Sequence, residues 1–323
     1  MNVKTEVLLA EQRIRNYIRE TYLDYSPSLS DQSNGKAFLK LENLQVTGSF
    51  KARGSLNKVL SLSETEKAQG IVTASTGNHG LGVANALTQT GAKGTIYLPK
   101  NVAAIKANAI KSFNVPIEFY GADSLEAETK ARKVAEETGQ IYISPYNDEQ
   151  VIGGQGTIGV ELLRQLPDLD CVLVSVGGGG LIGGIAGYIK EINPKIKVIG
   201  CLPENAPVMF ECLKAGKIIN VPESPTLSDG TAGGLDEDSI TFEICQKYID
   251  DFILVNEQEI ADGMRFVIEN HRQIVEGSAG VTIAAFLKEK EKFAGKNSAL
   301  IMCGGNVSFE KLQKIIHRDG GNN

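Results

Sequence analysis

Short, continuously apolar runs separated by helical patterns constrain the fold of this chain more than any other feature. The apolar runs lie at residues 71–74, 94–98, 117–120, 141–143, 171–176, 197–201 and 299–303. Helical patterns are expected around them, at residues 50–63, 80–90, 103–113, 124–138 and 156–165. Strands that are apolar on both faces are typical of parallel sheets covered by helices on both sides. The pattern therefore predicts an α/β fold of twisted, mostly parallel sheets.

The number of expected strands indicates two domains. About ten strands are too many for one small sheet, since sheets usually have about four to six. We expect a small domain at residues 70–147 and a large domain built from both flanks, residues 1–69 and 148–323. Ligands in such folds bind beyond the carboxyl ends of the strands. The segments discussed next lie at such ends.

The composition excludes several classes of protein. Hydrophobic residues make up 42% of the chain and charged residues 22%, as in a globular protein. The net charge of −6 argues against a nucleic-acid-binding surface. No stretch approaches the ~20 apolar residues of a membrane span, and no secretory signal is expected. Five cysteines without closely spaced pairs favour free thiols in a reducing compartment. We therefore expect a cytoplasmic protein.

One lysine lies in surroundings that favour chemistry. Lys51 is part of Gly48-Ser49-Phe50-Lys51-Ala52-Arg53-Gly54, between small and aromatic residues. A partly desolvated lysine loses proton affinity and becomes a nucleophile that can form a Schiff base with an aldehyde cofactor. A single motif of this kind more often marks a solvated lysine at a helix start. Three further segments favour the Schiff-base interpretation.

Four consecutive glycines follow the fifth apolar run. Gly177 to Gly180 would expose backbone N–H groups, and the helix that begins there would add positive potential, which suits a phosphate. The same stretch satisfies the dinucleotide fingerprint through Gly178, Gly180 and Gly183, with Glu204 near the position of an acidic ribose partner. A nicotinamide- or flavin-dependent oxidoreductase and a plain packing turn are therefore the alternatives at this motif.

A second turn joins the first apolar run to a helix. Ser75-Thr76-Gly77-Asn78-His79 would present successive N–H groups suited to a carboxylate, and the Asn78 amide could donate to a phenolic oxygen. Ser75 or Thr76 could also act as an ordinary helix cap. His79 is expected to be structural rather than catalytic.

The last apolar run leads into Cys303-Gly304-Gly305-Asn306. Cys303 alone could be a small buried hydrophobe. Beside a pyridine ring, its neutral thiol could meet the ring nitrogen without keeping that nitrogen protonated, which favours prompt elimination over a long-lived carbanion.

Together these segments resemble the fold-type II pyridoxal phosphate enzymes, in the branch of threonine/serine dehydratases and serine racemase. The resemblance runs from about Leu39 to Val307 and rests on six segments in order: residues 40–51, 75–79, 153–157, 177–180, 276–280 and 303–306. It implies pyridoxal 5′-phosphate as the cofactor, a fold like that of tryptophan synthase β, and a homodimer.

The resemblance also implies roles for particular residues. Lys51 would hold the cofactor as a Schiff base and remove the substrate's α-proton, and Phe50 would pack against the ring. Asn78 would donate to the ring's 3′-oxygen, and Cys303 would face the ring nitrogen. The cofactor phosphate would be bound by the N–H groups of Gly177, Gly178, Gly179, Gly180 and Leu181. The substrate carboxylate would be bound by Ser75, Thr76, Gly77, Asn78 and His79.

Some positions differ from the serine racemases that this sequence resembles. Leu202 and Val208 stand where the animal enzymes carry acidic metal ligands, so no divalent metal site is expected. Tyr146 is closer to the dehydratase pattern, and could border a pocket for a larger β-substituent or pack at a domain hinge. Thr76 places a hydroxyl opposite Lys51 that could return a proton to the α-carbon.

The sequence thus predicts a pyridoxal phosphate-dependent ammonia-lyase, or dehydratase. Its expected substrate is an L-β-hydroxy-α-amino acid such as threonine, serine, hydroxyaspartate or phenylserine, which it would convert to a 2-keto acid and ammonia. The first alternative is an amino-acid racemase with dehydratase side activity. The others are the nucleotide-dependent oxidoreductase and a non-catalytic small-ligand binding protein on the same fold.

Overall fold

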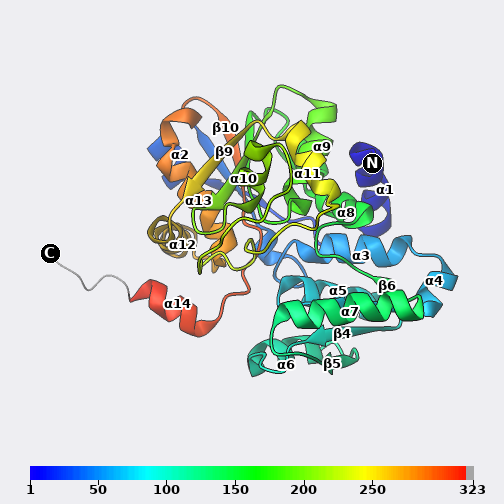
Figure 1. Ribbon diagram of the computed structural model, residues 1–323. Helices are drawn as coiled ribbons and strands as arrows, with labels where there is room; N and C mark the ends of the chain where they lie inside the picture. Colours follow the sequence, from blue (N-terminus) through cyan, green and yellow to red (C-terminus); the bar gives the residue numbers. More distant parts are fainter. Residues whose placement is uncertain (318–323) are drawn as a thin grey trace.

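Two separate sheets organise the chain in the computed structural model, which describes residues 1–317 (Figure 1). The larger sheet has six strands in the order β1-β2-β10-β7-β8-β9. Their bounds are Leu23–Ser26, Lys36–Lys40, Asn297–Ile301, Cys171–Ser175, Lys197–Pro203 and Asp251–Val255. Only β1, at the edge, runs antiparallel to its neighbour; the other pairs are parallel. The expected α/β class with mostly parallel sheets is confirmed.

The smaller sheet has four parallel strands in the order β5-β4-β3-β6. Their bounds are Ile117–Phe119, Gly94–Leu98, Ile71–Ala74 and Ile141–Tyr142. In Figure 1 this sheet and the helices α5 (Asn78–Thr90), α6 (Ala104–Lys111) and α7 (Ser124–Thr138) occupy the lower part of the view. Helix α3 (Lys51–Ser61) runs between them and the larger sheet.

The remaining helices surround the larger sheet or extend from it, except α4, which connects α3 to β3 of the smaller sheet. They are α1 (Val3–Ile14), α2 (Pro27–Ser33), α4 (Glu64–Gln69), α8 (Glu149–Gln165), α9 (Gly180–Ile192), α10 (Val208–Ala215), α11 (Ile240–Tyr248), α12 (Glu257–His271), α13 (Gly277–Lys288) and α14 (Phe309–Ile316), with 3-10 turns at η1 (Glu42–Leu44) and η2 (Lys290–Phe293). Helix α8 packs against α1, α3 and α9, while α13 packs on β7, β8 and β9. Among residues 1–317, no helix is both long and apolar enough to cross a bilayer.

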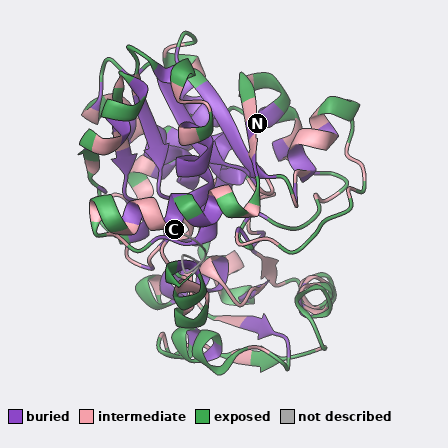
Figure 2. Ribbon diagram, turned by 90° about the vertical axis from the view of Figure 1, so that its left-hand side faces the viewer, coloured by how far each residue is buried: buried purple, intermediate pink, exposed green. Residues whose placement is uncertain are grey.

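The main core lies in the larger sheet. Strand β7 is buried at every position, and the buried residues around it form one continuous cluster, seen as the purple centre of Figure 2. Burial on both faces explains why this strand reads as an unbroken apolar run. The smaller sheet is covered by smaller clusters, so its helices expose more of their surface.

One helix begins earlier than the sequence predicts. The expected helix at 156–165 is α8, which begins at Glu149 after Asp148, whose Oδ1 accepts from the backbone N–H groups of Gln150 and Val151 at 2.9 Å each. Gly153, Gly154 and Gly156, at or before the expected start, are packing positions inside the helix. A Cβ on Gly154 would lie 2.5 Å from the Cα of Gly54, so only glycine lets α8 approach α3 this closely.

A fully buried group of charges anchors α3 to the larger sheet. We call Lys40, Glu42, Arg53 and Glu161 the ionic cluster; all four side chains are fully buried. Arg53 donates to Glu42 at 2.7 and 2.8 Å and to Glu161 at 2.7 and 3.0 Å, while Lys40 donates to Glu161 at 2.5 Å. Burial alone would raise the pKa of Glu161, but Arg53 and Lys40 lower it to about 2. The cluster therefore holds the first turn of α3, two residues from Lys51, in a defined position.

Candidate active site

The segments singled out in the sequence meet at one edge of the larger sheet. Strands β2, β10 and β7 are parallel neighbours, so their carboxyl ends lie side by side. The Lys51 segment follows β2, the Cys303 segment follows β10, and the four glycines follow β7. Ser49 pairs with Gly304 in an isolated bridge, and the Phe50 N–H donates to the Cys303 carbonyl at 3.0 Å. The topology thus joins segments that are far apart in the sequence.

Lys51 is the first residue of α3 and is partly buried. Its Nζ donates to the Pro145 carbonyl at 2.6 Å and lies 5.1 Å from the centre of the Phe50 ring. Desolvation lowers the pKa of Lys51 to about 8, although Cys303 and Glu276 oppose this shift. A larger fraction of its amine is therefore neutral and nucleophilic at physiological pH than for an exposed lysine.

The four glycines form a turn into which side chains would not fit. A Cβ on Gly178 would lie 2.4 Å from the Tyr146 ring, and one on Gly177 would lie 2.8 Å from the Cα of Thr231. Gly179 has φ +85° and is the N-cap of α9, with no side-chain cap. The first N–H groups of α9, from Gly180 onward, are therefore available to an anion at the helix's positive end.

Tyr146 packs beside this turn and links it to a distant loop. Its ring lies against Gly178, and its hydroxyl accepts from the Asp236 backbone N–H at 2.8 Å. Asp236 in turn forms an ion pair with Arg132 of α7 at 3.2 Å. Tyr146 thus contacts the four-glycine turn after β7 of the larger sheet and, through Asp236, is linked to α7 beside the smaller sheet. It follows Pro145, whose carbonyl accepts from Lys51. This geometry agrees equally with a pocket wall and with a hinge residue.

The turn at residues 75–79 follows β3 of the smaller sheet. Helix α5 begins at Asn78, and its N-cap is Gly77, which has no capping side chain. The suggestion that Ser75 or Thr76 caps this helix is therefore wrong; the Ser75 hydroxyl instead accepts from the Gly77 N–H at 3.2 Å. Residues 75–78 are all partly exposed. No side chain caps the backbone N–H groups in the first turn of α5.

His79 is turned away from this surface. It is buried, and its Nε2 lies 3.1 Å from the Thr73 hydroxyl and 3.0 Å from the Ile143 carbonyl. Burial lowers the pKa of His79 to about 3, and the charge of Lys51 acts in the same direction. The imidazole is therefore neutral and donates to β-sheet partners, as expected for a structural histidine. Any contact of His79 with a carboxylate would involve its backbone.

Cys303 is fully enclosed behind the Lys51 segment. It is 1% exposed, and the Ser175 hydroxyl lies 3.5 Å from its Sγ, at the end of β7. Burial raises the pKa of the Cys303 thiol, and the nearby Glu276 raises it further. Cys303 is therefore a neutral thiol throughout the physiological range.

Glu276 is the site residue to which the sequence assigned no role. It is buried, and both of its carboxylate oxygens accept from Asn78 Nδ2, at 2.8 and 3.0 Å. The Asn306 Nδ2 donates to the other end of the Asn78 amide at 2.7 Å. The segment 276–280 belonged to the resemblance, but only the three-dimensional contact with Asn78 shows what its acidic residue does.

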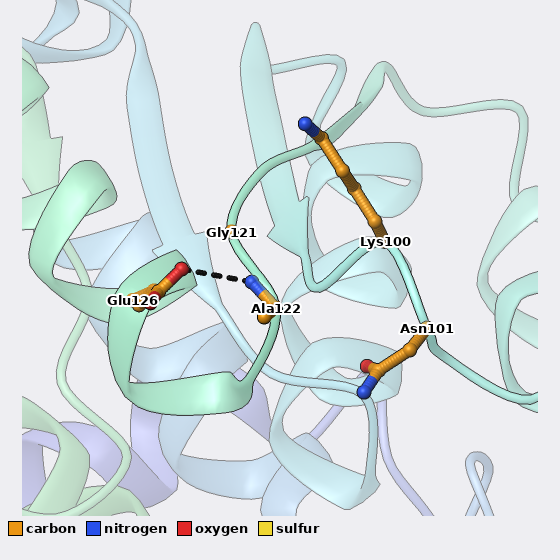
Figure 3. Close-up of a pocket in the computed structure, with 5 residues that line it drawn as sticks. All are labelled: Lys100, Asn101, Gly121, Ala122 and Glu126. Carbon is orange, nitrogen blue, oxygen red and sulfur yellow. Dashed lines mark hydrogen bonds between the residues drawn. The ribbon is translucent and has the colours of Figure 1, made fainter.

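A hollow outside the expected site lies beyond the carboxyl ends of two strands of the smaller sheet. This hollow of about 480 Å³ is lined by Lys100, Asn101, Gly121, Ala122 and Glu126, after β4 and β5; Glu126 points toward the Ala122 N–H and accepts from it at 2.8 Å (Figure 3). None of the residues expected in the site lines it. Within residues 1–317, no group of three or more His, Cys, Asp or Glu side chains is placed to hold a metal ion.

Comparisons with known proteins agree with this geometry. The family model of pyridoxal-phosphate dependent enzymes matches residues 14–304. The L-threonine ammonia-lyase of Thermotoga maritima is 41% identical over 96% of this chain and 77% of its own length. The catabolic L-threonine dehydratase TdcB of Escherichia coli K12 is 36% identical over 96% of this chain and 94% of its own. The structure of maize serine racemase superposes with a TM-score of 0.91 at 33% identity, covering 97% of this chain and 96% of the other.

These matches remove the oxidoreductase alternative. A dinucleotide site would need Glu204 as the acidic partner of the ribose. Glu204 is instead exposed, and its Oε1 lies 3.3 Å from Lys288 Nζ. The four glycines, Lys51 and Cys303 follow three neighbouring strands of the larger sheet, β7, β2 and β10. The chain belongs to the family of pyridoxal-phosphate dependent enzymes.

Proposed function

We propose that this protein is an ammonia-lyase that converts an L-β-hydroxy-α-amino acid, with L-threonine the first candidate, into a 2-keto acid and ammonia. The observation that carries the proposal is that the partly desolvated Lys51 amine and the four-glycine turn follow β2 and β7, the two strands that flank β10 in the larger sheet. The L-threonine ammonia-lyase and the L-threonine dehydratase, similar over 96% of this chain, favour the same reaction and substrate.

The residues present fit pyridoxal 5′-phosphate. The turn at 177–180 is a cradle that a Cβ would fill, and the start of α9 offers N–H groups to a phosphate. Lys51 would bond to the cofactor's aldehyde, and Phe50 would lie against the ring. Asn78 would donate its amide to the ring oxygen, and the neutral Cys303 thiol would lie near the ring nitrogen. The cofactor, when bound, withdraws electrons from the substrate's α-carbon.

The side chains then perform the proton transfers. The Lys51 amine would take the substrate's α-proton. The C–O bond to the β-hydroxyl breaks, and the hydroxyl leaves as water once it has gained a proton. Addition of water to the remaining unsaturated amine releases ammonia and leaves the keto acid; L-threonine gives 2-oxobutanoate. Residues 75–79 would hold the substrate carboxylate by backbone N–H groups, and Tyr146 would border the β-substituent.

The pKa of Lys51 predicts how the apoprotein captures its cofactor. Only the neutral amine attacks the aldehyde, so the capture rate should rise with pH through about 8 and level off above roughly pH 9. An ordinary lysine would give a rate that keeps rising past about pH 10. The rate is measured by stopped-flow absorbance after mixing apoprotein with pyridoxal phosphate. Nα-acetyl-lysine serves as the control for titration of the cofactor itself; matching pH profiles would contradict the lowered pKa.

Racemisation is the second candidate activity, favoured by the fit to maize serine racemase and by the hydroxyl of Thr76. A hydroxyl opposite Lys51 could return a proton to the other face of the α-carbon. Thr76→Ala should then lower D/L interconversion roughly 100-fold or more while keto-acid formation falls much less. Chiral chromatography of the amino acid measures the first rate, with Thr76→Ser as the matched control. Equal loss of both rates would show that Thr76 has no such specific role.

The lyase is tested directly with a panel of L-β-hydroxy amino acids. Keto acid formed from one of them, with a matching change in the cofactor's absorbance, is the expected result and identifies the substrate. An absorbance change with D-isomer but no keto acid would establish the racemase instead. Neither product from any member of the panel would overturn the proposed activity.

The remaining expectations form part of the same proposal. We propose a homodimer located in the cytoplasm, consistent with the family and with buried free cysteines. We also propose that residues 70–147, which include the smaller sheet, form one domain and that residues 1–69 with 148–323 form the other. Light scattering of the purified protein tests the dimer.

A further inference from the structure

A chain of amide and carboxylate groups joins four of the sequence segments that resemble the family. Asn306 Nδ2 donates to the Thr47 carbonyl at 2.9 Å and to Asn78 Oδ1 at 2.7 Å. Asn78 Nδ2 then donates to Glu276. Thr47 lies just before the Lys51 segment, Asn306 follows β10, Asn78 begins α5, and Glu276 precedes α13. This network therefore links the two sheets at the candidate active site.

The two ends of the network fix the orientation of every amide within it. A backbone carbonyl can only accept, so Asn306 must present its NH2 group to Thr47 and to the oxygen of Asn78. An ionised carboxylate can also only accept, so Glu276 must face the NH2 group of Asn78. If the Asn78 amide were flipped, its NH2 group would face the NH2 group of Asn306, and its oxygen would face the carboxylate oxygens of Glu276. Neither pair could form a hydrogen bond. The amide is thus held in one orientation. Its Nδ2 carries two N–H groups, so when one of them serves the carboxylate the other can donate to a further acceptor.

We propose that Glu276 is a positioning residue: its ionised carboxylate orients the Asn78 amide toward the cofactor, and protonation of Glu276 loosens that hold. The inference rests on the proposed function, because it assigns the remaining N–H of Asn78 to the cofactor ring. A hydrogen bond to a carboxylate is about twice as strong as one to a neutral carboxyl. The negative charge also favours positive charge at the Lys51 nitrogen.

The surroundings of Glu276 allow it to exchange protons near neutral pH. Burial is the main cause that raises the pKa of Glu276 to about 7, and the charge of Asp229 acts in the same direction. Hydrogen bonds from the Asn78 side chain and the Asn306 backbone, together with the charge of Lys51, oppose this shift. A cavity of about 50 Å³ adjoins the carboxylate, large enough for water. Three further charged groups line this cavity from other elements: Lys106 of α6, Asp229, and Lys311 of α14, which pairs with Asp229 at 2.8 Å.

The test compares cofactor affinity between the wild-type protein and Glu276→Gln across pH. Glutamine keeps the shape and an acceptor oxygen but has no charge to lose. The dissociation constant of pyridoxal phosphate is measured by equilibrium dialysis between pH 5.5 and 8.5, and the ratio of the two constants isolates Glu276 from the titration of Lys51. We expect near-equal constants at pH 5.5 and roughly tenfold weaker binding by the variant at pH 8.5. A ratio that does not change with pH would overturn the proposal.

A second variant keeps the test decisive if Glu276→Gln folds poorly. Asp229→Asn removes a charge that raises the pKa of Glu276, so the rise in wild-type affinity with pH should move to lower pH without disappearing. Glu243→Gln, an exposed carboxylate on α11, is the control and should leave the profile unchanged. An unmoved profile in Asp229→Asn would contradict the role of Glu276. If the wild-type protein binds no cofactor or forms no keto acid, the proposed function fails instead, and the two failures are distinguishable.

Discussion

Replacing Lys51 with alanine is expected to remove both the cofactor-derived visible absorbance of the reconstituted protein and its turnover. Lys51 is the amine that lies against the Phe50 ring and the Pro145 carbonyl, where desolvation lowers its pKa to about 8. Under the proposed function, the variant would lack both the amine that attaches the cofactor and the base that takes the α-proton. We expect keto-acid formation to fall by roughly 10⁴-fold or more, measured with L-threonine at saturating pyridoxal phosphate.

The control for this variant is Lys67→Ala. Lys67 lies on α4 and forms a surface ion pair with Glu64 at 2.9 Å, so its loss should leave absorbance and turnover within about twofold of wild type. Circular dichroism establishes that both variants are folded. Turnover by Lys51→Ala above a few per cent of wild type would refute Lys51 as the base.

Arg53→Met has the largest expected effect on stability. The substitution removes the guanidinium that neutralises Glu42 and Glu161, and both carboxylates are fully buried. Lys40 and Arg15 still pair with Glu161, but Glu42 then keeps only the hydroxyl of Thr21, at 2.6 Å. Leaving a buried charge uncompensated costs about 3–5 kcal/mol. Urea unfolding followed by circular dichroism measures the loss in the transition that includes the larger sheet.

The same variant should also change the response to acid. Because the folded-state pKa of Glu161 is lowered to about 2, its contribution to stability is present above the unfolded value, about 4.3, and is lost as pH falls toward 2. Removing Arg53 should raise the pH at which acid unfolding begins. Arg164→Met is the matched control: its exposed pair with Glu20, at 2.7 Å, should be worth less than about 1 kcal/mol. Equal destabilisation by both variants would contradict the assigned role of the ionic cluster.

Seven of the ten strands among residues 1–317 could be predicted from continuous apolar runs, whereas β1, β2 and β9 were not among the expected runs. β3 and β4 lie at the expected residues, and β7 is shorter by one residue at its carboxyl end. Helix α7 also agrees with its expected bounds, since Asp123 accepts from the Glu126 N–H at one end and Gly139 adopts a left-handed conformation at the other. In each case the signal is local: an apolar run, a cap or a terminating glycine.

The start of α8 could not be predicted in the same way. The first turns of α8 contain Gly153, Gly154 and Gly156, and glycine is a poor helix former. They are tolerated here because α8 packs so closely on α3 and α9 that a Cβ at Gly154 or Gly156 would meet backbone atoms. That requirement comes from helices more than twenty residues away in sequence, so a local pattern does not contain it.

In the candidate site, too, local signals could be predicted from the sequence and long-range contacts could not. The sequence predicted which segments matter, because lysine, glycine and cysteine carry their chemistry in their own atoms. It did not predict the role of Glu276, whose partner Asn78 is 198 residues away. The sequence also did not predict the hydrogen bond from the Asp236 N–H to the Tyr146 hydroxyl, which joins residues 90 positions apart. Contacts of this kind depend on the meeting of distant strand ends and appear only in the folded chain.

The role of Lys51 as the cofactor's anchor is tested most directly by chemical trapping. The protein is reconstituted with pyridoxal phosphate, reduced with borohydride and digested, and the modified peptide is located by mass spectrometry. A single pyridoxyl group on Lys51 is the expected result, because this lysine combines a pKa lowered to about 8 with a position beside the four-glycine turn. A pyridoxyl group on another lysine, or none at all, would contradict the proposed site.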